Sequence, residues 1–218
     1  MLERERLGIA MKSEEIWKYI HSERADMATT WATLTNDQWA TSSWCGGWTV
    51  KDTAGHVLSA AEQTPMNFIK EMAMAGFKFN VFADRGARKL SVLSPEELVR
   101  RLRARTTTTN HPPAPVIAML GEIVVHGEDI RRPLGLTHAT PEAALVAIAD
   151  NWKNSNVLIG AKKRVTGVKL RATDVNWVHG EGPEVSGPLI SLILAMGGRK
   201  RALVDLTGEG VAILTARD

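Results

Sequence analysis

The sequence predicts an α plus α/β fold, in which an all-helical domain is followed by a small α/β domain. Apolar residues recur at helical spacing through the first two-thirds of the chain, and after residue 135 one segment alternates with a period of two. The chain has 218 residues, 44% of them hydrophobic, which is enough for one large core or two modest ones. We therefore expect a helical bundle over 1–137 and an α/β domain over 138–218.

Two helices are expected in the first half of the bundle. The first spans about 13–34, where apolar residues keep an approximately helical period. A loop rich in tryptophan and turn formers then leads to Thr49, which is followed three residues later by Asp52 in a capping-box pattern. The second helix therefore begins at Thr49 and is expected to continue to about residue 75, with a kink at Pro65.

Two further helices complete the predicted bundle. Ser94 is placed as an N-cap and Pro95 occupies the first turn, so a third helix begins there. The fourth begins near Pro115 and ends before Pro133. Four antiparallel helices are the economical arrangement for such segments.

The α/β domain is predicted from shorter signals. A helix is expected over 140–160, and the next segment places Val168, Leu170 and Ala172 on one face of a strand. A short apolar helix is expected in "GPLISLILAMGG", with proline at its start and glycines at its end. Two short strands around a glycine-containing turn are expected in "RALVDLTGEGVAIL".

Composition narrows the class of protein. The single cysteine, Cys45, excludes an intramolecular disulfide framework and a multi-cysteine zinc site. The N-terminus lacks the apolar segment of a secretory signal, and no apolar stretch approaches the roughly 20 residues that span a bilayer. The net charge of +3 is mild, and the basic clusters at 100–105 and 199–201 contain no aromatic residues. We expect a cytoplasmic protein that binds neither nucleic acid nor membrane.

Glu122, His126 and Asp129 form a polar stripe on the predicted fourth helix. At about 100° per residue, positions 122 and 126 lie roughly 40° apart, and Asp129 lies within about 60° of His126. A solvated helix face is the usual interpretation of such a stripe, but apolar residues surround this one and favour burial. A buried carboxylate needs a partner, and a metal cation is an effective one. The stripe therefore predicts the wall of an internal polar pocket.

A third ligand is needed for a catalytic metal, because catalytic zinc commonly has three protein ligands and one open position. Five other histidines are available: His21, His56, His111, His138 and His179. His56 is the best placed, since it lies about two turns into a helix that a bundle sets beside the fourth. Two nitrogens and a carboxylate suit zinc, although iron, nickel or manganese fits the same donors.

Two segments carry a family resemblance. "WCGGWTVKDTAGHV" followed by "GEIVVHGEDIRRPLG" resembles the mycothiol-dependent maleylpyruvate isomerase family, within the DinB superfamily of metal-binding four-helix bundles. The C-terminal stretch from residue 171 resembles the second domain of that family, which is similar to sterol-carrier proteins. The resemblance implies that His56, Glu122 and His126 bind a divalent metal, normally zinc. It also implies that the open position receives the thiol of mycothiol, or water when thiol is absent.

The resemblance further implies two catalytic residues. Asp129 would lie near the metal or the bound thiol, and Arg199, in the "GGR" stretch, would anchor a substrate carboxylate. Its neighbour Arg201 is an alternative anchor, and a simpler interpretation is that these cations complement a helix dipole. The expected function is that of a zinc-dependent mycothiol S-transferase or isomerase acting on a small electrophile that carries a carboxylate. We expect a monomer or homodimer.

Two other functions stay open at this point. The same metal could activate water in a hydrolase. A non-enzymatic binding protein with a structural metal ranks third, because structural zinc usually has four protein ligands. Cys45 is expected to be a packing residue. Trp39, Trp44 and Trp48 are expected to anchor the loop to the bundle, and the sequence does not select which of them lines a pocket.

Overall fold

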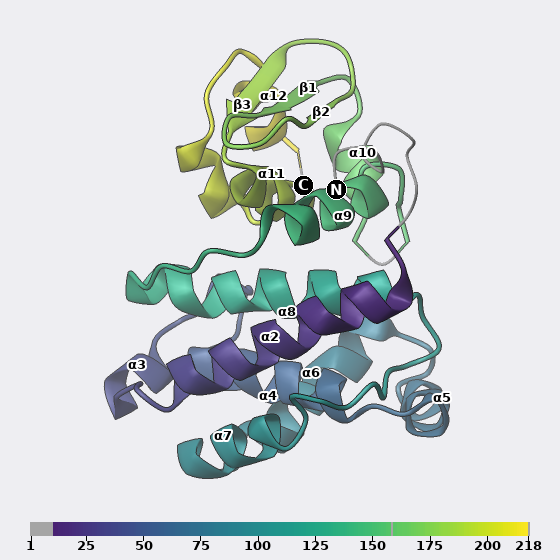
Figure 1. The fold of residues 1–218 in the computed structure, drawn as a ribbon, viewed down its shortest axis with the longest axis vertical. Helices are drawn as coiled ribbons and strands as arrows, with labels where there is room; N and C mark the ends of the chain where they lie inside the picture. Colours follow the sequence, from purple (N-terminus) through teal and green to yellow (C-terminus); the bar gives the residue numbers. More distant parts are fainter. Residues whose placement is uncertain (1–10, 158, 218) are drawn as a thin grey trace.

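The computed structural model describes residues 11–157 and 159–217, which form two layers (Figure 1). Helices within residues 13–131 build the lower layer, and the sheet with its helices builds the upper one. The lower layer contains α2 (Ser13–Trp31), α3 (Asn36–Ala40), α4 (Val50–Glu62), α5 (Pro65–Met74), α6 (Phe79–Ser91), α7 (Pro95–Arg103) and α8 (Val116–Arg131). The predicted fold class, a helical bundle with a small α/β part, is confirmed.

The bundle is built where the sequence predicts it. Thr49 accepts a hydrogen bond from the Asp52 amide and the Asp52 carboxylate accepts one from the Thr49 amide, so the capping box at the start of α4 is confirmed. Ser94 caps α7 and Pro95 occupies its first turn. Buried apolar side chains such as Leu58 and Leu120 fill the space between the helices. This packing fixes the rotation of α4 and α8, which carry the candidate site.

The predicted continuation of the second helix to residue 75 is wrong. α4 ends at Glu62, and Gln63 adopts an extended conformation as its C-cap. Thr64 then caps a separate helix, α5, in which Pro65 occupies the first turn. A residue before proline avoids the helical region, and proline is favoured at the first helical position. Pro65 therefore begins a new helix and does not kink an old one.

Helix α6 was not expected from the sequence, yet it packs along α4. Glycines allow the close approach. A Cβ on Gly55 would lie 2.5 Å from the carbonyl oxygen of Ala87, and one on Gly86 would lie 2.6 Å from the hydroxyl oxygen of Ser59. Both helices therefore come close enough for α6 to form one side of the candidate site.

The upper layer holds a three-stranded sheet in the order β2–β1–β3. β1 (Lys169–Ala172) pairs antiparallel with β2 (Val178–His179) and parallel with β3 (Glu184–Gly187). The predicted face is confirmed, because Val168, Leu170 and Ala172 are all buried. The layer also contains α9 (Glu142–Trp152), α10 (Ala161–Val165) and α11 (Leu189–Met196). α11 confirms the predicted short apolar helix.

The two strands predicted after α11 are wrong. The segment forms a 3₁₀ helix, η2 (Lys200–Asp205), and a short helix, α12 (Gly210–Thr215). Its buried residues are spaced by four, as in the pair Ala202 and Leu206 and the pair Gly210 and Leu214. That spacing suits helical turns, whereas Val204, between the first pair, is 83% exposed. One β-bridge remains in the segment, between Thr207 and Ser186.

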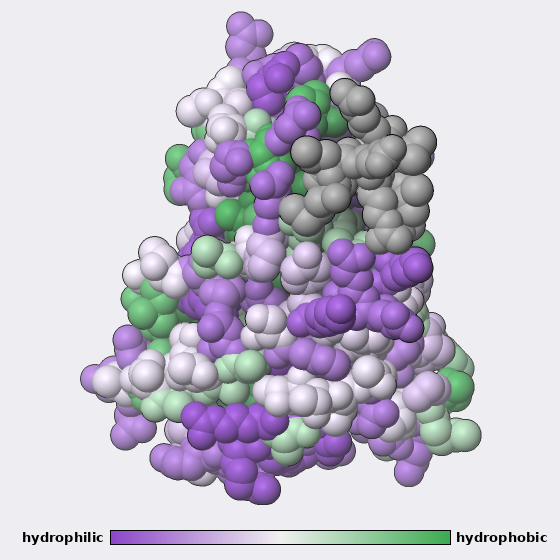
Figure 2. All heavy atoms as spheres, viewed as in Figure 1, coloured by the Kyte–Doolittle hydropathy of each residue, from purple (hydrophilic) through white to green (hydrophobic). Residues whose placement is uncertain are grey.

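The buried apolar residues form one continuous cluster that extends from the bundle through α8 and α9 to the sheet. The division at residue 137 therefore stays a prediction. Figure 2 shows a largely hydrophilic face with only small hydrophobic patches. Among the described residues, no helix combines the length and apolarity needed to cross a membrane. Residues 1–10, on which the expected lack of a secretory signal rests, lie outside the described residues.

Candidate metal centre

The structure brings three predicted side chains together between α4 and α8. His56 projects from α4, and Glu122 and His126 project from consecutive turns of α8. The Nε2 atom of His56 lies 2.6 Å from Oε1 of Glu122, and the Nε2 atom of His126 lies 3.4 Å from the same oxygen. One ligand atom from each of the three residues lies within 4.8 Å of the others. The arrangement offers two nitrogens and one oxygen to a single point.

The hydrogen bonds of the two imidazoles indicate which of their nitrogens face this point as acceptors. Nδ1 of His126 lies 2.9 Å from Oδ2 of Asp129 and donates to that carboxylate. The ring of His56 hydrogen-bonds the backbone of Ala83, and its Nε2 faces Glu122, so Nδ1 is the donor. With both protons on Nδ1, the Nε2 lone pairs of the two histidines and the carboxylate of Glu122 point toward one place. Three converging acceptors fit a divalent cation.

Burial and charge shift the titration of these groups. Burial opposes a charge on His56, but the nearby Glu122 carboxylate outweighs it and raises the His56 pKa above its ordinary value of 6.5. Burial likewise opposes a charge on Glu122, but His126 and His56 lower its pKa to about 2. Oε1 of Glu122 is buried and has no hydrogen bond of good geometry. A cation among the three groups would satisfy this oxygen, so the residues fit a metal.

Asp129 and Arg199, the two predicted catalytic residues, lie directly beside this centre. Asp129 is fully buried and accepts from His126 on one side. On the other side Arg199 donates to it twice, from Nε at 3.1 Å and from Nη2 at 2.7 Å. These bonds offset the effect of burial and lower the Asp129 pKa. Asp129 therefore connects a candidate metal ligand to a cation from the upper layer.

Arg199 keeps part of its hydrogen-bonding capacity free. Its Nη1 atom donates to the carbonyl oxygen of Gly197 at the end of α11, as expected for a cation near a helix C-terminus. A guanidinium has five N–H donors, and three are used by Asp129 and Gly197, so two remain unused within the described part of the chain. The alternative anchor, Arg201, is exposed on η2 and does not make these contacts.

Trp48 is the loop tryptophan that lies at the centre. Its ring centroid is 4.9 Å from that of His56 and 6.4 Å from that of His126. Its Nε1 donates to the carboxylate of Asp84 on α6. Trp44 instead stacks on Arg132, and Trp39 is buried against Trp31. The sequence could not select Trp48 because α6, which holds its polar end, was not predicted.

Cys45 lies closer to the centre than expected. It forms a second possible donor group with His126 and Asp129, again with ligand atoms within 4.8 Å. Burial, followed by the negative charge of Asp129, raises the pKa of its thiol to about 12. The thiol is therefore protonated near neutral pH in the metal-free protein. The sequence signal was its position three residues before Trp48 in the same loop.

The other candidate histidines make different contacts. His21 hydrogen-bonds the carbonyl oxygen of Thr108, and His138 lies between the carboxylates of Glu23 and Asp26. His111 contacts the carbonyl oxygen of Pro112, and His179 is in β2. Within the described part of the chain, neither of the possible metal-binding groups includes any of these four residues.

The fold and site define a class of protein: a helical bundle with a candidate metal centre, joined to a small α/β unit. The sequence comparison then gives a family match over part of the chain. Residues 20–114 match the family model of the mycothiol maleylpyruvate isomerase N-terminal domain. The resemblance predicted from the sequence is therefore confirmed. Of the three candidate ligands, His56 is the one inside the matched range.

Solved structures extend the likeness of fold to nearly the whole chain. The chain is similar to the crystal structures of a mycothiol-dependent maleylpyruvate isomerase and of a point mutant of it. In each case the TM-score is 0.63 at 15% sequence identity, over 91% of this chain and 93% of the other. No curated protein sequence matches this chain.

Proposed function

We propose that this protein is a metal-dependent enzyme that uses mycothiol as cosubstrate and acts as an isomerase or thiol S-transferase. Zinc is the proposed metal, and the proposed substrate is a small electrophile that bears a carboxylate. The convergence of two imidazole nitrogens and the Glu122 carboxylate carries the proposal, because such a donor set fits a catalytic cation. The names of the family and of the similar crystal structures supply the thiol and the reaction class.

Five residues have distinct roles in this proposal. His56, Glu122 and His126 would hold the metal, which when bound supplies the positive charge that keeps a thiol in its thiolate form near neutral pH. Asp129 keeps the His126 proton on Nδ1 and so leaves Nε2 free to act as a ligand. The two free N–H donors of Arg199 bind the substrate carboxylate and orient the electrophilic carbon.

The chemistry requires only the thiolate and a polarised substrate. In isomerisation, the sulfur adds to one carbon of an activated cis double bond, and the π electrons move onto the conjugated carbonyl group. Rotation about the resulting single bond follows. The electrons then return, the carbon–sulfur bond breaks and the thiolate leaves with its electron pair. In S-transfer, the same attack expels a leaving group and the sulfur stays on the product.

The test combines metal analysis with a screen of electrophiles in the presence and absence of mycothiol. We expect about one equivalent of divalent metal per chain and turnover that requires the thiol. H126A should lose the metal and reduce turnover by more than about 100-fold while the circular dichroism spectrum is retained. H179A, which removes a histidine outside the donor group, is the matched control and should keep both metal and turnover.

Two results would contradict the proposal. Turnover that is equally fast without thiol would indicate a hydrolase that uses metal-bound water. Unfolding of H126A or of the metal-depleted protein would indicate that the metal is structural.

A further inference from the structure

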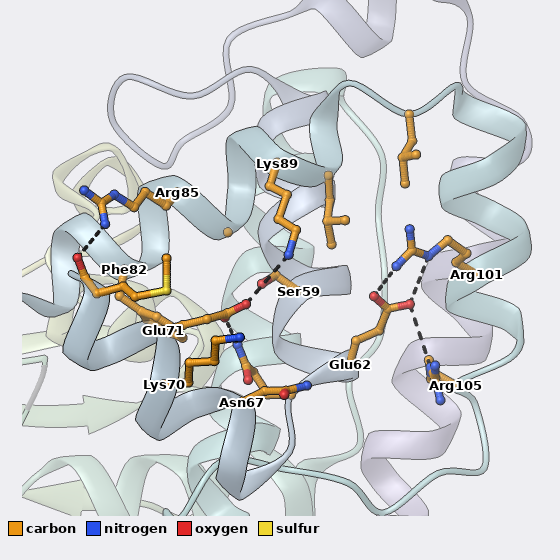
Figure 3. Close-up of a pocket in the computed structure, with 15 residues that line it drawn as sticks. Ser59, Glu62, Asn67, Lys70, Glu71, Phe82, Arg85, Lys89, Arg101 and Arg105 are labelled. Carbon is orange, nitrogen blue, oxygen red and sulfur yellow. Dashed lines mark hydrogen bonds and ion pairs between the residues drawn. The ribbon is translucent and has the colours of Figure 1, made fainter.

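A cavity lies in the bundle, apart from the three residues of the candidate metal centre. Its volume is about 930 Å³, and residues of α4, α5, α6 and α7 line it (Figure 3). None of His56, Glu122 and His126 is among the lining residues. The lining residues of α4, Ser59 and Glu62, are three and six residues beyond His56, which is about 4.5 and 9 Å along the helix axis. The volume lies within the range of small-molecule sites.

The cavity carries an excess of positive charge. Five cationic side chains and two carboxylates line it, so three positive charges are in excess. Figure 3 shows that these side chains come from different helices and surround the opening. A concave surface of one sign raises the local concentration of ions of the opposite sign. The cations are Lys70, Arg85, Lys89, Arg101 and Arg105, and the carboxylates are Glu62 and Glu71.

The two carboxylates are already shared among other partners. Arg101 donates twice to Glu62, whereas Nε of Arg105 lies 3.9 Å from Glu62, beyond hydrogen-bond distance. That Nε atom is buried and has no hydrogen-bond partner among the residues that the structure describes. Glu71 is 3.7 Å from Lys89, and within the described residues Lys70 has no carboxylate partner. Arg105 and Lys70 are therefore able to bind a further anion.

Gln63 adds an unused acceptor to the wall. Gln63 is 5% exposed, and its Nε2 donates to the Glu71 carboxylate at 2.7 Å. Its Oε1 is buried without a partner. A buried acceptor left unsatisfied costs about 1–3 kcal/mol, so a hydroxyl donor from a ligand would be favourable here. Phe82 and Leu90 form an apolar part of the same lining.

Helix α5 leaves this space open. The helix has no buried residue, and its contact with α6 includes an edge-to-face pair of Phe68 and Phe82 with ring centroids 5.2 Å apart. It therefore forms a wall of the cavity without packing closely against α4. The result is a polar space between helices, in contrast to the apolar core found elsewhere in the bundle.

We propose that this cavity binds a small organic anion that also carries hydroxyl groups, such as a phosphorylated polyol. Lys70 and Arg105, the cations without a close carboxylate partner, attract its anionic group, and a hydroxyl group donates to Oε1 of Gln63. Its carbon skeleton contacts Phe82. The site is independent of the proposed thiol chemistry, because it contains none of the residues that would bind metal or substrate.

The experiment is a calorimetric titration of the metal-loaded, full-length protein with glucose 6-phosphate, glucose, inorganic phosphate and citrate. We expect saturable binding of glucose 6-phosphate with a Kd of about 1 mM or lower, and weaker binding of the other three probes. K70Q and R105Q should each weaken this binding about fivefold or more. Q63M should remove the preference for glucose 6-phosphate over inorganic phosphate.

Two control variants test whether the binding belongs to this cavity. R103Q removes an exposed cation from the same helical segment without changing the cavity lining, and it should leave binding unchanged. H126A should also bind normally, because the metal centre is not involved. The proposal is overturned if no probe saturates up to about 20 mM, or if R103Q weakens binding as much as R105Q. Loss of binding in H126A, or equal affinity for phosphate and glucose 6-phosphate, would overturn it as well.

Discussion

The positions of two imidazole protons determine what the centre between α4 and α8 can bind. Both Nδ1 atoms donate away from it, to Ala83 and Asp129, so both Nε2 lone pairs face Glu122. The Glu-x-x-x-His pair and the choice of His56 were readable from helical spacing. The hydrogen bond from His56 to the backbone of Ala83 could not be read from the sequence, because Ala83 belongs to α6, a helix that the sequence pattern did not reveal.

Asp129 is the residue whose change should affect both the stability of the metal-free protein and its affinity for metal. D129N keeps the volume but leaves Arg199 without a carboxylate, and it weakens the hold on the His126 proton. We expect a loss of about 3 kcal/mol in the free energy of unfolding of the metal-free protein, measured by urea denaturation. Metal affinity, measured by chelator competition, should fall about 10- to 100-fold.

The control for this substitution is D37N, which removes an exposed carboxylate on α3. It should change the free energy of unfolding by no more than about 0.5 kcal/mol. If D129N unfolds at the same urea concentration as the unmodified protein, the buried bridge contributes nothing to stability.

Replacing Cys45 tests which of the two possible donor groups binds the metal. C45A should leave metal content and thiol-dependent turnover unchanged, because the thiol has a pKa of about 12 and is outside the group of His56, Glu122 and His126. Metal content by mass spectrometry and turnover are the measurements. Loss of metal from C45A would instead assign the ion to the group of Cys45, His126 and Asp129.

At the scale of elements, the close contact of α4 and α6 places His56. Gly55 precedes this histidine and leaves no room for a side chain against the backbone of α6. A glycine within a helix normally weakens it, so intrinsic helix propensity alone counts against Gly55 in α4 and Gly86 in α6. Here both allow two backbones to approach. Helix propensity therefore disfavours glycine at these positions, whereas the close packing of α4 against α6 requires it.

Gly55→Ala should destabilise the protein, although alanine normally favours a helix more than glycine does. The new Cβ would lie 2.5 Å from the carbonyl oxygen of Ala87 and 2.9 Å from the amide nitrogen of Ser91. We expect a loss of about 1–3 kcal/mol in the free energy of unfolding, together with weaker metal binding as α4 moves away from α6. Urea denaturation and chelator competition measure both effects.

Gly46→Ala is the comparison for this change, because no atom lies within 4 Å of the added Cβ and its backbone conformation is ordinary. It should be nearly neutral. A stabilised Gly55→Ala protein would show that the contact between α4 and α6 is looser than described.

The elements that could be predicted are those with strong local signals. Thr49 with Asp52 and Ser94 with Pro95 indicated two helix starts correctly. α6 was missed because no capping side chain marks its start after Lys78 and Gly86 lies within it, although its apolar residues keep a helical spacing. The segment after α11 was misassigned because its short apolar runs fit a strand or a helical turn equally well, and tertiary packing selects between them.

At the scale of the whole molecule, the upper layer completes the site with Arg199. A second contact lies nearby: Arg132, at the end of α8, donates to Glu128 and to Ser191 of α11. The order of the two parts was readable from the change of pattern near residue 135. Their mutual orientation was not, because it depends on side-chain contacts between residues about 60–70 positions apart.

The pH dependence of stability in the metal-free protein follows from two opposite shifts. Glu122 has a pKa of about 2 when folded against an ordinary 4.5, so its contribution is complete above pH 4.5 and is lost as pH falls toward 2. The pKa of His56 is raised above 6.5, so its contribution is complete below pH 6.5 and is lost as pH rises through the folded value. The Tm should therefore be highest between about pH 4.5 and 6.5.

The control is E122Q, which removes the titrating carboxylate and the charge that raises the His56 pKa. Its Tm should vary less with pH on both sides of this window. Differential scanning calorimetry of metal-free samples provides the measurement. A Tm of the unmodified protein that keeps rising to pH 8 would contradict the assignment of these groups.

The bridge from Asp129 to Arg199 also limits how the two parts of the chain can be recombined. A chimera that took its C-terminal portion from a distant homologue would still contain the buried aspartate of α8. It would be compatible only if the donor supplied an arginine at the matching place after its own apolar helix. Coevolution of these two positions is therefore the expected signature in homologues that exchange this portion.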